Sequence, residues 1–225
     1  MIWLFKNYYI PLQSGRELFM IEEHLFALNI FGDYDDSAWM ATEPIWRGIA
    51  VELEELHYLK GASFIKQLKQ IVYYGEFHPV EGETDIYSTG GEQSPDYKNL
   101  LNVAHKAVEH GCRVFILPNP KGTRTPDFIF EQKGNFKIYD LKTISGKNSV
   151  SNRLFESIGQ SNRVLLNMTV DYNIRLLASD IKSYFETNQD ALEVLIFKGK
   201  KEISIDRYFT LSPQYHKLFR KRYEK

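Results

Sequence analysis

The alternation of helix-like and strand-like segments after residue 94 is the pattern that most restricts the fold of this chain. Apolar residues recur at intervals of three and four from Pro95 to His110, and short apolar runs bounded by turn residues follow. This order predicts an α/β fold whose mixed sheet has helices on both faces. The predicted segments are helix 95–110, strands 113–117, 128–130 and 136–141, helix 150–162, strand 164–166, helix 174–187, and strands 192–197 and 202–205.

The first 93 residues predict a mainly helical region instead. Apolar residues recur with helical spacing in segments 14–32, 46–59 and 64–71. The periodicity then fails from residue 76 to 93, where glycines lie among acidic and small polar residues, so we predict a linker there. The expected division is therefore an acidic, helical N-terminal region at 1–93 and a second domain at 94–225.

Charge is distributed unevenly between these two parts. Residues 1–93 contain 6 Lys and Arg against 15 Asp and Glu, a balance of −9, whereas residues 94–225 contain 22 against 14, a balance of +8. A basic domain joined to an acidic one suggests a polyanionic ligand for the first and a shielding or partner-binding role for the second. Chance segregation of solvated charges is the alternative.

Composition limits the environment in which the chain is expected. No run approaches the roughly 20 apolar residues of a membrane span, so we predict no membrane segment and no cleaved signal. A single cysteine, Cys112, excludes a disulfide within the chain and a thiolate zinc cluster. The expectation is a cytoplasmic protein, with export by another route left open.

Two carboxylates and a lysine form the strongest chemical motif. Asp127 opens one strand of a predicted hairpin, and Asp140 follows after twelve intervening residues, near the end of the partner strand. Antiparallel pairing brings these two strand ends together. Lys142 lies two residues beyond Asp140 and therefore on the same face of the strand. The motif predicts a site where two acids meet beside an ammonium group.

These groups suit metal-assisted hydrolysis of a phosphodiester. Asp127, Asp140 and the Leu141 carbonyl offer oxygen ligands, for which Mg²⁺ (or Mn²⁺) is the expected ion. The ion would neutralise phosphate charge and lower the pKa of a bound water, and Lys142 would orient that water or stabilise the developing charge. A structural Asp–Lys ion pair after a Pro-Asp turn is the alternative.

The same residues resemble the signature of the PD-(D/E)xK nuclease superfamily, which has the restriction-endonuclease-like fold. Pro126-Asp127 and Asp140-Leu141-Lys142 match its motif, and the order helix, three strands, helix, strand is also that of its core. The resemblance implies a nuclease domain preceded by the helical N-terminal region, with Asp127, Asp140 and Lys142 as its reacting centre.

This sequence departs from the superfamily pattern on the first core helix, where many members carry a further acidic residue. The helix is expected to run antiparallel to the next strand, which places Glu109 far from Asp127. Asp96 or Glu92 would then supply the acid, or Asn102 would occupy the position in a weaker form.

Residues from about 104 to 207 also look like toxin domains of bacterial contact-dependent growth inhibition proteins, some of which are tRNA nucleases. This narrower resemblance implies a toxin that cuts RNA, with tRNA slightly favoured over DNA. The segments that carry it are Gly111-Cys112-Arg113-Val114, Leu117-Pro118, Thr125-Pro126-Asp127, Asp140-Leu141-Lys142, Asn152-Arg153-Leu154 and Gln160.

Further side chains are candidates for contact with the substrate. Gln160, on the predicted helix after the hairpin, matches a position where related nucleases often place a polar residue that touches the metal-bound water or the phosphate. Lys147, Arg153 and Arg163 flank the same region and are candidates for phosphate contacts, with a solvated surface charge as the alternative for each. The basic tail 217–222 is either a nucleic-acid contact or a frayed terminus.

The sequence thus predicts a metal-dependent nuclease acting on RNA or DNA. One rival hypothesis is a catalytically degenerate domain that binds nucleic acid without cutting it. Another is an interaction protein, for instance of a mobile element, whose acidic helices bind a partner. An inhibitor or partner protein at the acidic N-terminal region would fit either the nuclease or the interaction hypothesis.

Overall fold

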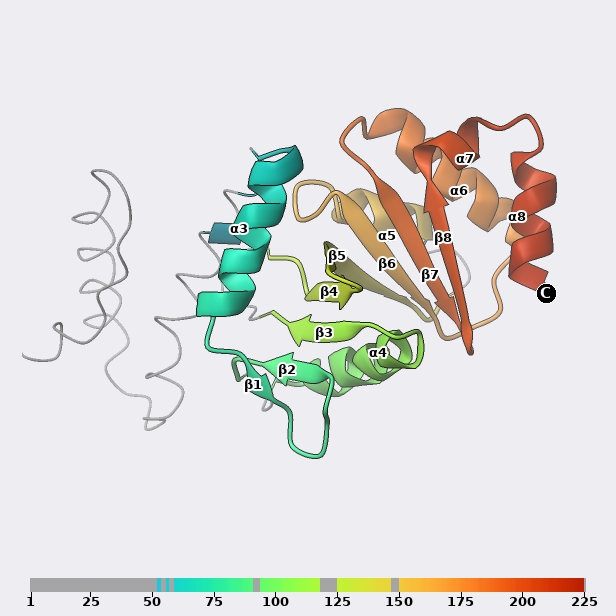
Figure 1. Ribbon diagram of the computed structural model, residues 1–225. Coiled ribbons are helices and arrows are strands. Elements are labelled where there is room, and N and C mark those ends of the chain that lie inside the picture. Colours follow the sequence, from blue (N-terminus) through green and yellow to red (C-terminus); the bar gives the residue numbers. More distant parts are fainter. Residues whose placement is uncertain are drawn as a thin grey trace, which may run out of the picture. The chain divides into compact units, whose positions relative to one another are not determined.

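The computed structural model describes residues 52, 53, 56, 59–90, 94–117, 125–146 and 150–224. In this part of the chain, eight strands form one mixed sheet accompanied by six helices (Figure 1). The helices are α3 (Gly61–Tyr74), α4 (Tyr97–Glu109), α5 (Val150–Glu156), α6 (Ile174–Thr187), α7 (Arg207–Leu211) and α8 (Tyr215–Glu224). The strands are β1 (His78–Pro79), β2 (Ile86–Ser88), β3 (Arg113–Ile116), β4 (Phe128–Gln132), β5 (Asn135–Ile144), β6 (Arg163–Met168), β7 (Glu193–Lys198) and β8 (Lys201–Asp206).

The strands lie in the sheet in the order of the sequence, from β1 to β8. Neighbours are parallel in the pairs β2–β3, β5–β6 and β6–β7, and antiparallel in the other four pairs. The predicted mixed α/β sheet is confirmed, and so is the order helix, three strands, helix, strand, formed by α4, β3, β4, β5, α5 and β6. The assignment of this core to the restriction-endonuclease-like fold stays a prediction.

Strand β5 changes its pairing partner halfway along its length. Residues 135–139 pair with β4, and residues 140–144 pair with β6. The change occurs at Asp140, so the described sheet consists of two halves that share one long strand. Polar groups at this point therefore lie where one ladder ends and the next begins.

Three hydrophobic clusters cover the two faces of the sheet. Tyr139 and Leu141 of β5 point into the cluster under α4. Ile138 points to the other face, into the cluster under α3, and Ile144 belongs to the cluster under α5, α6 and α8. Because side chains alternate along a strand, Asp140 and Lys142 share the face of Ile138 and Ile144. They lie between two hydrophobic cores.

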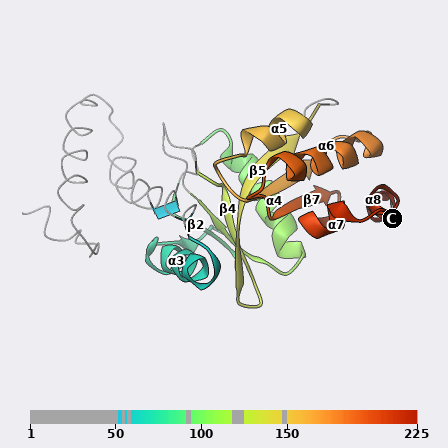
Figure 2. The ribbon, with the colours of Figure 1, turned by 90° about the horizontal axis from the view of Figure 1, so that it is seen from above.

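The C-terminal half of the sheet is covered by helices whose apolar sides fit the predicted periodicity. Figure 2 shows α5 and α6 side by side. Helix α6 has the predicted bounds and is capped by Asn173, whose side chain accepts hydrogen bonds from the N–H groups of Arg175 and Leu176. Helix α5 is shorter than predicted and ends at Glu156 rather than near residue 162.

The N-terminal side of the described chain differs from the prediction in one respect. The segment predicted to be a linker contains β1 and β2, and β2 pairs in parallel with β3. The helical prediction at 64–71 is confirmed by α3. The helical segments predicted at 14–32 and, for the most part, 46–59 lie outside the described residues, and the domain boundary near residue 93 stays a prediction.

Candidate functional site

Asp127 and Asp140 meet where the β4–β5 ladder ends. Phe128 pairs with Tyr139, and continuing this register by one residue places Asp127 beside Asp140. The Leu141 N–H donates to Asp127 Oδ2 at 2.6 Å. This carboxylate oxygen therefore accepts a backbone hydrogen bond just beyond the last residue pair of the β4–β5 ladder. The structure thus brings Asp127 and Asp140 together, as the sequence predicts.

Lys142 completes the group from the same strand face. Its ammonium lies 2.8 Å from Oδ2 and 3.1 Å from Oδ1 of Asp140. Asp140 is 1% exposed. The Lys142 side chain is 14% exposed, so it connects the buried acid to the surface. We refer to Asp127, Asp140 and Lys142 as the acid–lysine triad.

The two acids perturb one another. Burial, together with the charge of Asp140 and a hydrogen bond between the two carboxyl groups, raises the pKa of Asp127 to about 7. The Leu141 N–H and the Lys142 ammonium act in the opposite direction but do not compensate. Two carboxyl groups in contact therefore resist carrying two negative charges, and an additional cation would allow both to ionise.

Oxygen donors for a cation are available at this point. In a strand, the N–H and the C=O of one residue point toward the same neighbouring strand. Because the Leu141 N–H points to Asp127, its carbonyl lies on the same edge of β5 as the acid pair. Carboxylate and carbonyl oxygens are the ligands that Mg²⁺ and Mn²⁺ prefer. The donor set therefore fits a hard divalent ion.

No third acidic ligand joins the pair within the described part of the chain. There, no group of three or more His, Cys, Asp and Glu side chains is placed to hold a metal ion. Helix α4, which begins after Asp96 and contains Asn102, covers the sheet face opposite to Asp140. Glu92, another predicted candidate, lies outside the described residues.

Ser157 and Tyr184 are two further residues that the fold connects to Asp140. Burial raises the pKa of the Tyr184 hydroxyl, and the charge of Asp140 adds to this effect, so the two groups are close. The hydroxyl contacts Ser157 and accepts a hydrogen bond from Asn188 Nδ2 at 3.2 Å. These residues are 17 and 44 positions from Asp140, and no local motif joins them to it.

Gln160 is not on a helix, contrary to the prediction. It lies in the turn that follows α5, and its side-chain amide donates to the Glu156 carbonyl at 2.7 Å. This bond satisfies a carbonyl at the helix end. A role for Gln160 in catalysis stays a prediction.

The three residues predicted to contact phosphates lie in different surroundings. Arg153 is exposed on α5 and pairs with Glu156 at 2.9 Å, as a solvated surface residue does. Lys147 lies outside the described residues. Arg163, by contrast, is largely buried at the start of β6.

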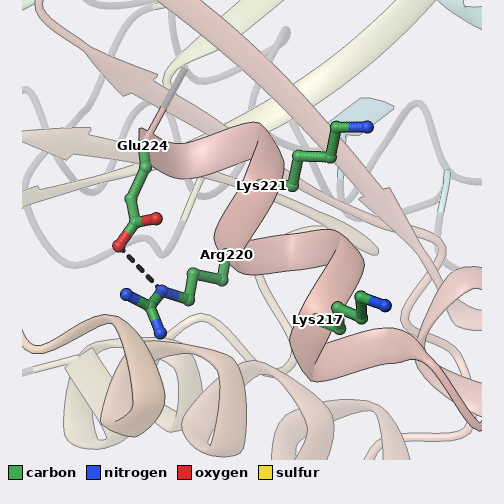
Figure 3. Close-up of a pocket in the computed structure, with 4 residues that line it drawn as sticks. All are labelled: Lys217, Arg220, Lys221 and Glu224. Atoms are coloured by element: carbon green, nitrogen blue, oxygen red, sulfur yellow. Dashed lines mark hydrogen bonds and ion pairs between the residues drawn. The ribbon is translucent and has the colours of Figure 1, made fainter.

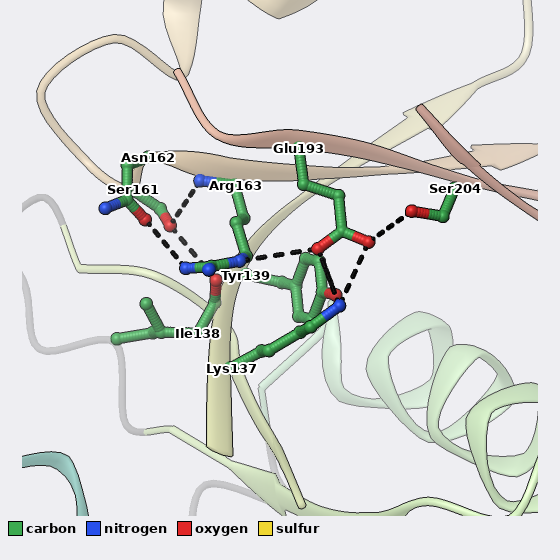
Figure 4. Close-up of polar contacts among 8 residues, drawn as sticks. All are labelled: Lys137, Ile138, Tyr139, Ser161, Asn162, Arg163, Glu193 and Ser204. Carbon is green, nitrogen blue, oxygen red and sulfur yellow. Dashed lines mark hydrogen bonds and ion pairs between the residues drawn. The ribbon is translucent and has the colours of Figure 1, made fainter. Parts of the chain in front are cut away.

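Arg163 belongs to a buried network around Glu193 (Figure 4). Its Nε lies 3.3 Å from Glu193 Oε2. Lys137 donates to both oxygens of Glu193, Tyr139 donates to Oε2 at 3.0 Å, and Ser204 donates to Oε1 at 2.6 Å. The network joins β5, β6, β7 and β8. Arg163 therefore has a structural role in holding these strands together. Its predicted contact with nucleic acid is not tested by this geometry.

The basic tail forms a helix and is not frayed. Tyr215, Phe219 and Tyr223 bury one side of α8. The other side presents Lys217, Arg220 and Lys221, which with Glu224 line a shallow hollow of about 320 Å³ (Figure 3). Arg220 Nε lies 2.8 Å from Glu224 Oε1, so one of these cations has a partner on its own helix.

Part of the chain is similar to a known family of domains. Residues 124–203, which contain the whole acid–lysine triad, match the contact-dependent growth inhibition CdiA C-terminal domain. The match spans about a third of the chain.

Among solved structures, a CdiA-CT/CdiI toxin and immunity complex from Burkholderia pseudomallei aligns with 16% sequence identity and a TM-score of 0.37. The alignment covers 52% of this chain and 89% of that one. No curated protein matches the sequence. Among the described residues, no helix combines the length and apolar character that crossing a bilayer requires.

Proposed function

We propose that this chain is a toxin of the contact-dependent growth inhibition type that acts as a metal-dependent nuclease. The single observation that carries the proposal is the direct contact between Asp127 and Asp140 beside Lys142, inside the segment that matches the CdiA C-terminal domain. The raised pKa of Asp127 supports it, because a site built for a cation has excess negative charge until the cation binds.

The metal is a proposal that rests on this donor set. Asp127, Asp140 and the Leu141 carbonyl would hold Mg²⁺ or Mn²⁺, which would supply charge neutralisation at a phosphate and an acidified water. Lys142 holds Asp140 in place and presents its ammonium toward the surface, where it would stabilise charge that develops on a phosphate oxygen.

The substrate proposed is RNA, with tRNA first. This choice comes from the resemblance to toxin domains, since the triad itself does not distinguish the two sugars. The partner proposed is an immunity protein, because the solved structure aligned above is a toxin and immunity complex.

A degenerate nuclease that binds nucleic acid without cutting it is the second candidate. The observation in its favour is that, in the described part of the chain, the acid pair has no third acidic or histidine ligand. Lys142 neutralises Asp140 in the absence of any ion, so the pair is also a stable structural unit.

The test is incubation of the purified full chain with tRNA, total RNA and plasmid DNA, with Mg²⁺, with Mn²⁺ and with EDTA. Asp140→Asn and Lys142→Ala are expected to reduce metal-dependent cleavage by about 100-fold or more. Asp171→Asn is the control, since the Asp171 side chain is 97% exposed and pairs with Lys198 at 3.5 Å. Cleavage that survives in both triad variants would contradict the proposal, and binding without cleavage would favour the degenerate domain.

A further inference from the structure

A groove of about 980 Å³ lies on the described structure, and Ile138 of β5 is among the residues that line it. One wall is α3, and the opposite wall is formed by the turn after α5, the start of β6 and the segment before β7. Leu53, Leu56 and Leu59, which precede α3, also line it. Ile138 and Asp140 are two residues apart on one face of β5, a separation of roughly 7 Å along the strand.

The α3 wall is strongly basic. Lys60, Lys66 and Lys69 line the groove and are exposed to solvent. Lys66 and Lys69 are one helical turn apart, and the Lys69 ammonium lies 5.5 Å from the centre of the Phe136 ring. Arg163 adds a fourth cation but already pairs with Glu193. Among the described lining residues the only carboxylate is Asp190, so the groove complements an anion.

The surfaces between these cations are apolar or carry amides. Ile65 is 36% exposed and Leu192 is 46% exposed, so both offer apolar surface to a ligand in the groove. Gln160 and Asn162 line the same wall as Leu192. Stacked bases inside a duplex cannot reach such a surface, whereas unstacked bases expose their faces and their hydrogen-bonding edges to it.

We infer that this groove receives a single-stranded segment of nucleic acid and leads it to the triad, with Lys60, Lys66 and Lys69 contacting its phosphates. The inference deepens the proposed function and rests on it for the identity of the substrate. It assigns substrate binding to α3, which lies outside the segment that matches the CdiA C-terminal domain. It also assigns Gln160 to substrate binding rather than to contact with the reacting atoms.

The experiment measures binding of a fluorescein-labelled single-stranded RNA of about 12 nucleotides by anisotropy, in EDTA, with the full chain. The variant is Lys60→Ala, Lys66→Ala and Lys69→Ala combined. At about 0.1 M salt, loss of three phosphate contacts is expected to weaken binding by about 100-fold and to reduce the slope of log K against log salt concentration by about 2. A duplex of the same sequence is expected to bind more weakly than the single strand.

The matched control is Lys98→Ala, Lys182→Ala and Lys200→Ala combined, which removes the same charge from exposed positions outside the groove. It is expected to retain nearly all of the affinity. Equal losses in the two triple variants would overturn the inference, because the binding would then depend on net charge alone. An unchanged affinity in the groove variant, or no binding by the unmodified chain, would overturn it as well.

The readout separates this inference from the proposed function. Binding in EDTA requires neither metal nor cleavage, so a protein that cuts nothing can still show the lysine-dependent loss. Conversely, cleavage that depends on Asp140 and Lys142 together with unaltered binding by the groove variant would retain the nuclease and reject the groove. Equal affinity for the duplex and the single strand would reject the single-stranded ligand.

Discussion

Asp127 carries a carboxyl group whose ionisation the fold opposes. Burial and Asp140 raise its pKa to about 7, so folding in the absence of metal favours its protonated form. In the unfolded chain the same group ionises near pH 4. The stability of the metal-free protein therefore falls as the pH rises from about 4 to about 7, because ionised Asp127 is tolerated only after unfolding.

We predict that Asp127→Asn stabilises the metal-free protein at pH 8. The amide keeps an acceptor for the Leu141 N–H and removes the second negative charge, so the gain is expected to reach about 2–4 kcal/mol. The measurement is urea denaturation in EDTA at several pH values, with Asp171→Asn, at a side chain 97% exposed, as the control. A gain that does not grow between pH 4 and pH 7 would contradict the assignment of the shifted pKa to Asp127.

Glu193 is an acid that the fold favours in its charged form. Glu193→Ala removes the acceptor of Tyr139 and Ser204 and leaves the largely buried Arg163 without its partner. We expect a loss of about 3 kcal/mol in unfolding free energy, measured by chemical denaturation. Glu186→Ala, which breaks an exposed pair with Lys182, is expected to change stability by less than about 0.5 kcal/mol. Similar effects for the two variants would show that the network adds little.

The same network predicts how stability responds to acid. Burial raises the pKa of Glu193, but the hydrogen bonds from Ser204 and Lys137 and the Lys137 and Arg163 charges outweigh it, so the pKa lies below its ordinary value of 4.5. The stability that Glu193 contributes is therefore present above pH 4.5 and lost as the pH falls through its lower folded value. Glu193→Gln should give a flatter stability profile below pH 4.5, and an unaltered profile would contradict this.

At the scale of elements, the packing of β6 against the helices sets the stability of the C-terminal half. Leu166 is fully buried in the cluster under α5, α6 and α8. Leu166→Ala is expected to lower the free energy of unfolding by about 2–5 kcal/mol. The truncation leaves a cavity beside a central strand, and the surrounding residues cannot move in to fill it. Leu211→Ala, at a position 68% exposed, should be nearly neutral in the same denaturation experiment. A small loss at Leu166 would indicate that this core adapts easily.

Elements with a strong hydrophobic period could be predicted from the sequence. Helices α4 and α6 were located to within two residues, because buried positions on both recur at three- and four-residue intervals. The end of α5 was not predictable in this way. Ile158 continues the apolar pattern but is 40% exposed, Ser157 donates to the Leu154 carbonyl, and Gly159 has a φ of 86°. Local hydrogen bonding therefore ends the helix early.

Only the part of the candidate site whose residues are close together in the sequence was predictable. Asp127, Asp140 and Lys142 belong to one hairpin, so alternation and antiparallel pairing were enough to bring them together. The groove lysines on α3 and the Glu193 network depend on contacts between residues more than fifty positions apart, such as Lys137 and Glu193. Strand β2 was missed because three residues are too short for a periodic signal.

At the scale of the whole molecule, the described sheet extends across the predicted boundary near residue 93. Strand β2 pairs with β3, and α3 covers Phe115, Leu117, Ile129 and Ile138. A fragment of residues 94–225 would expose these side chains. We predict that it unfolds at a lower temperature than a fragment of residues 45–225, which matches a compact unit of the chain, and that it binds a hydrophobic dye. Equal melting temperatures would support the boundary near residue 93.

The sharing of β5 between two half-sheets has a mechanical consequence. Asp127 is carried by the β4 half, whereas Asp140 and Lys142 are on the part of β5 that pairs with β6. Any torsion of one half against the other about the β5 axis therefore alters the spacing of the two acids directly, and it also strains the cluster under α4, which takes residues from both halves. A protein that binds both halves at once would fix this spacing, and one that binds a single half would leave it free to vary.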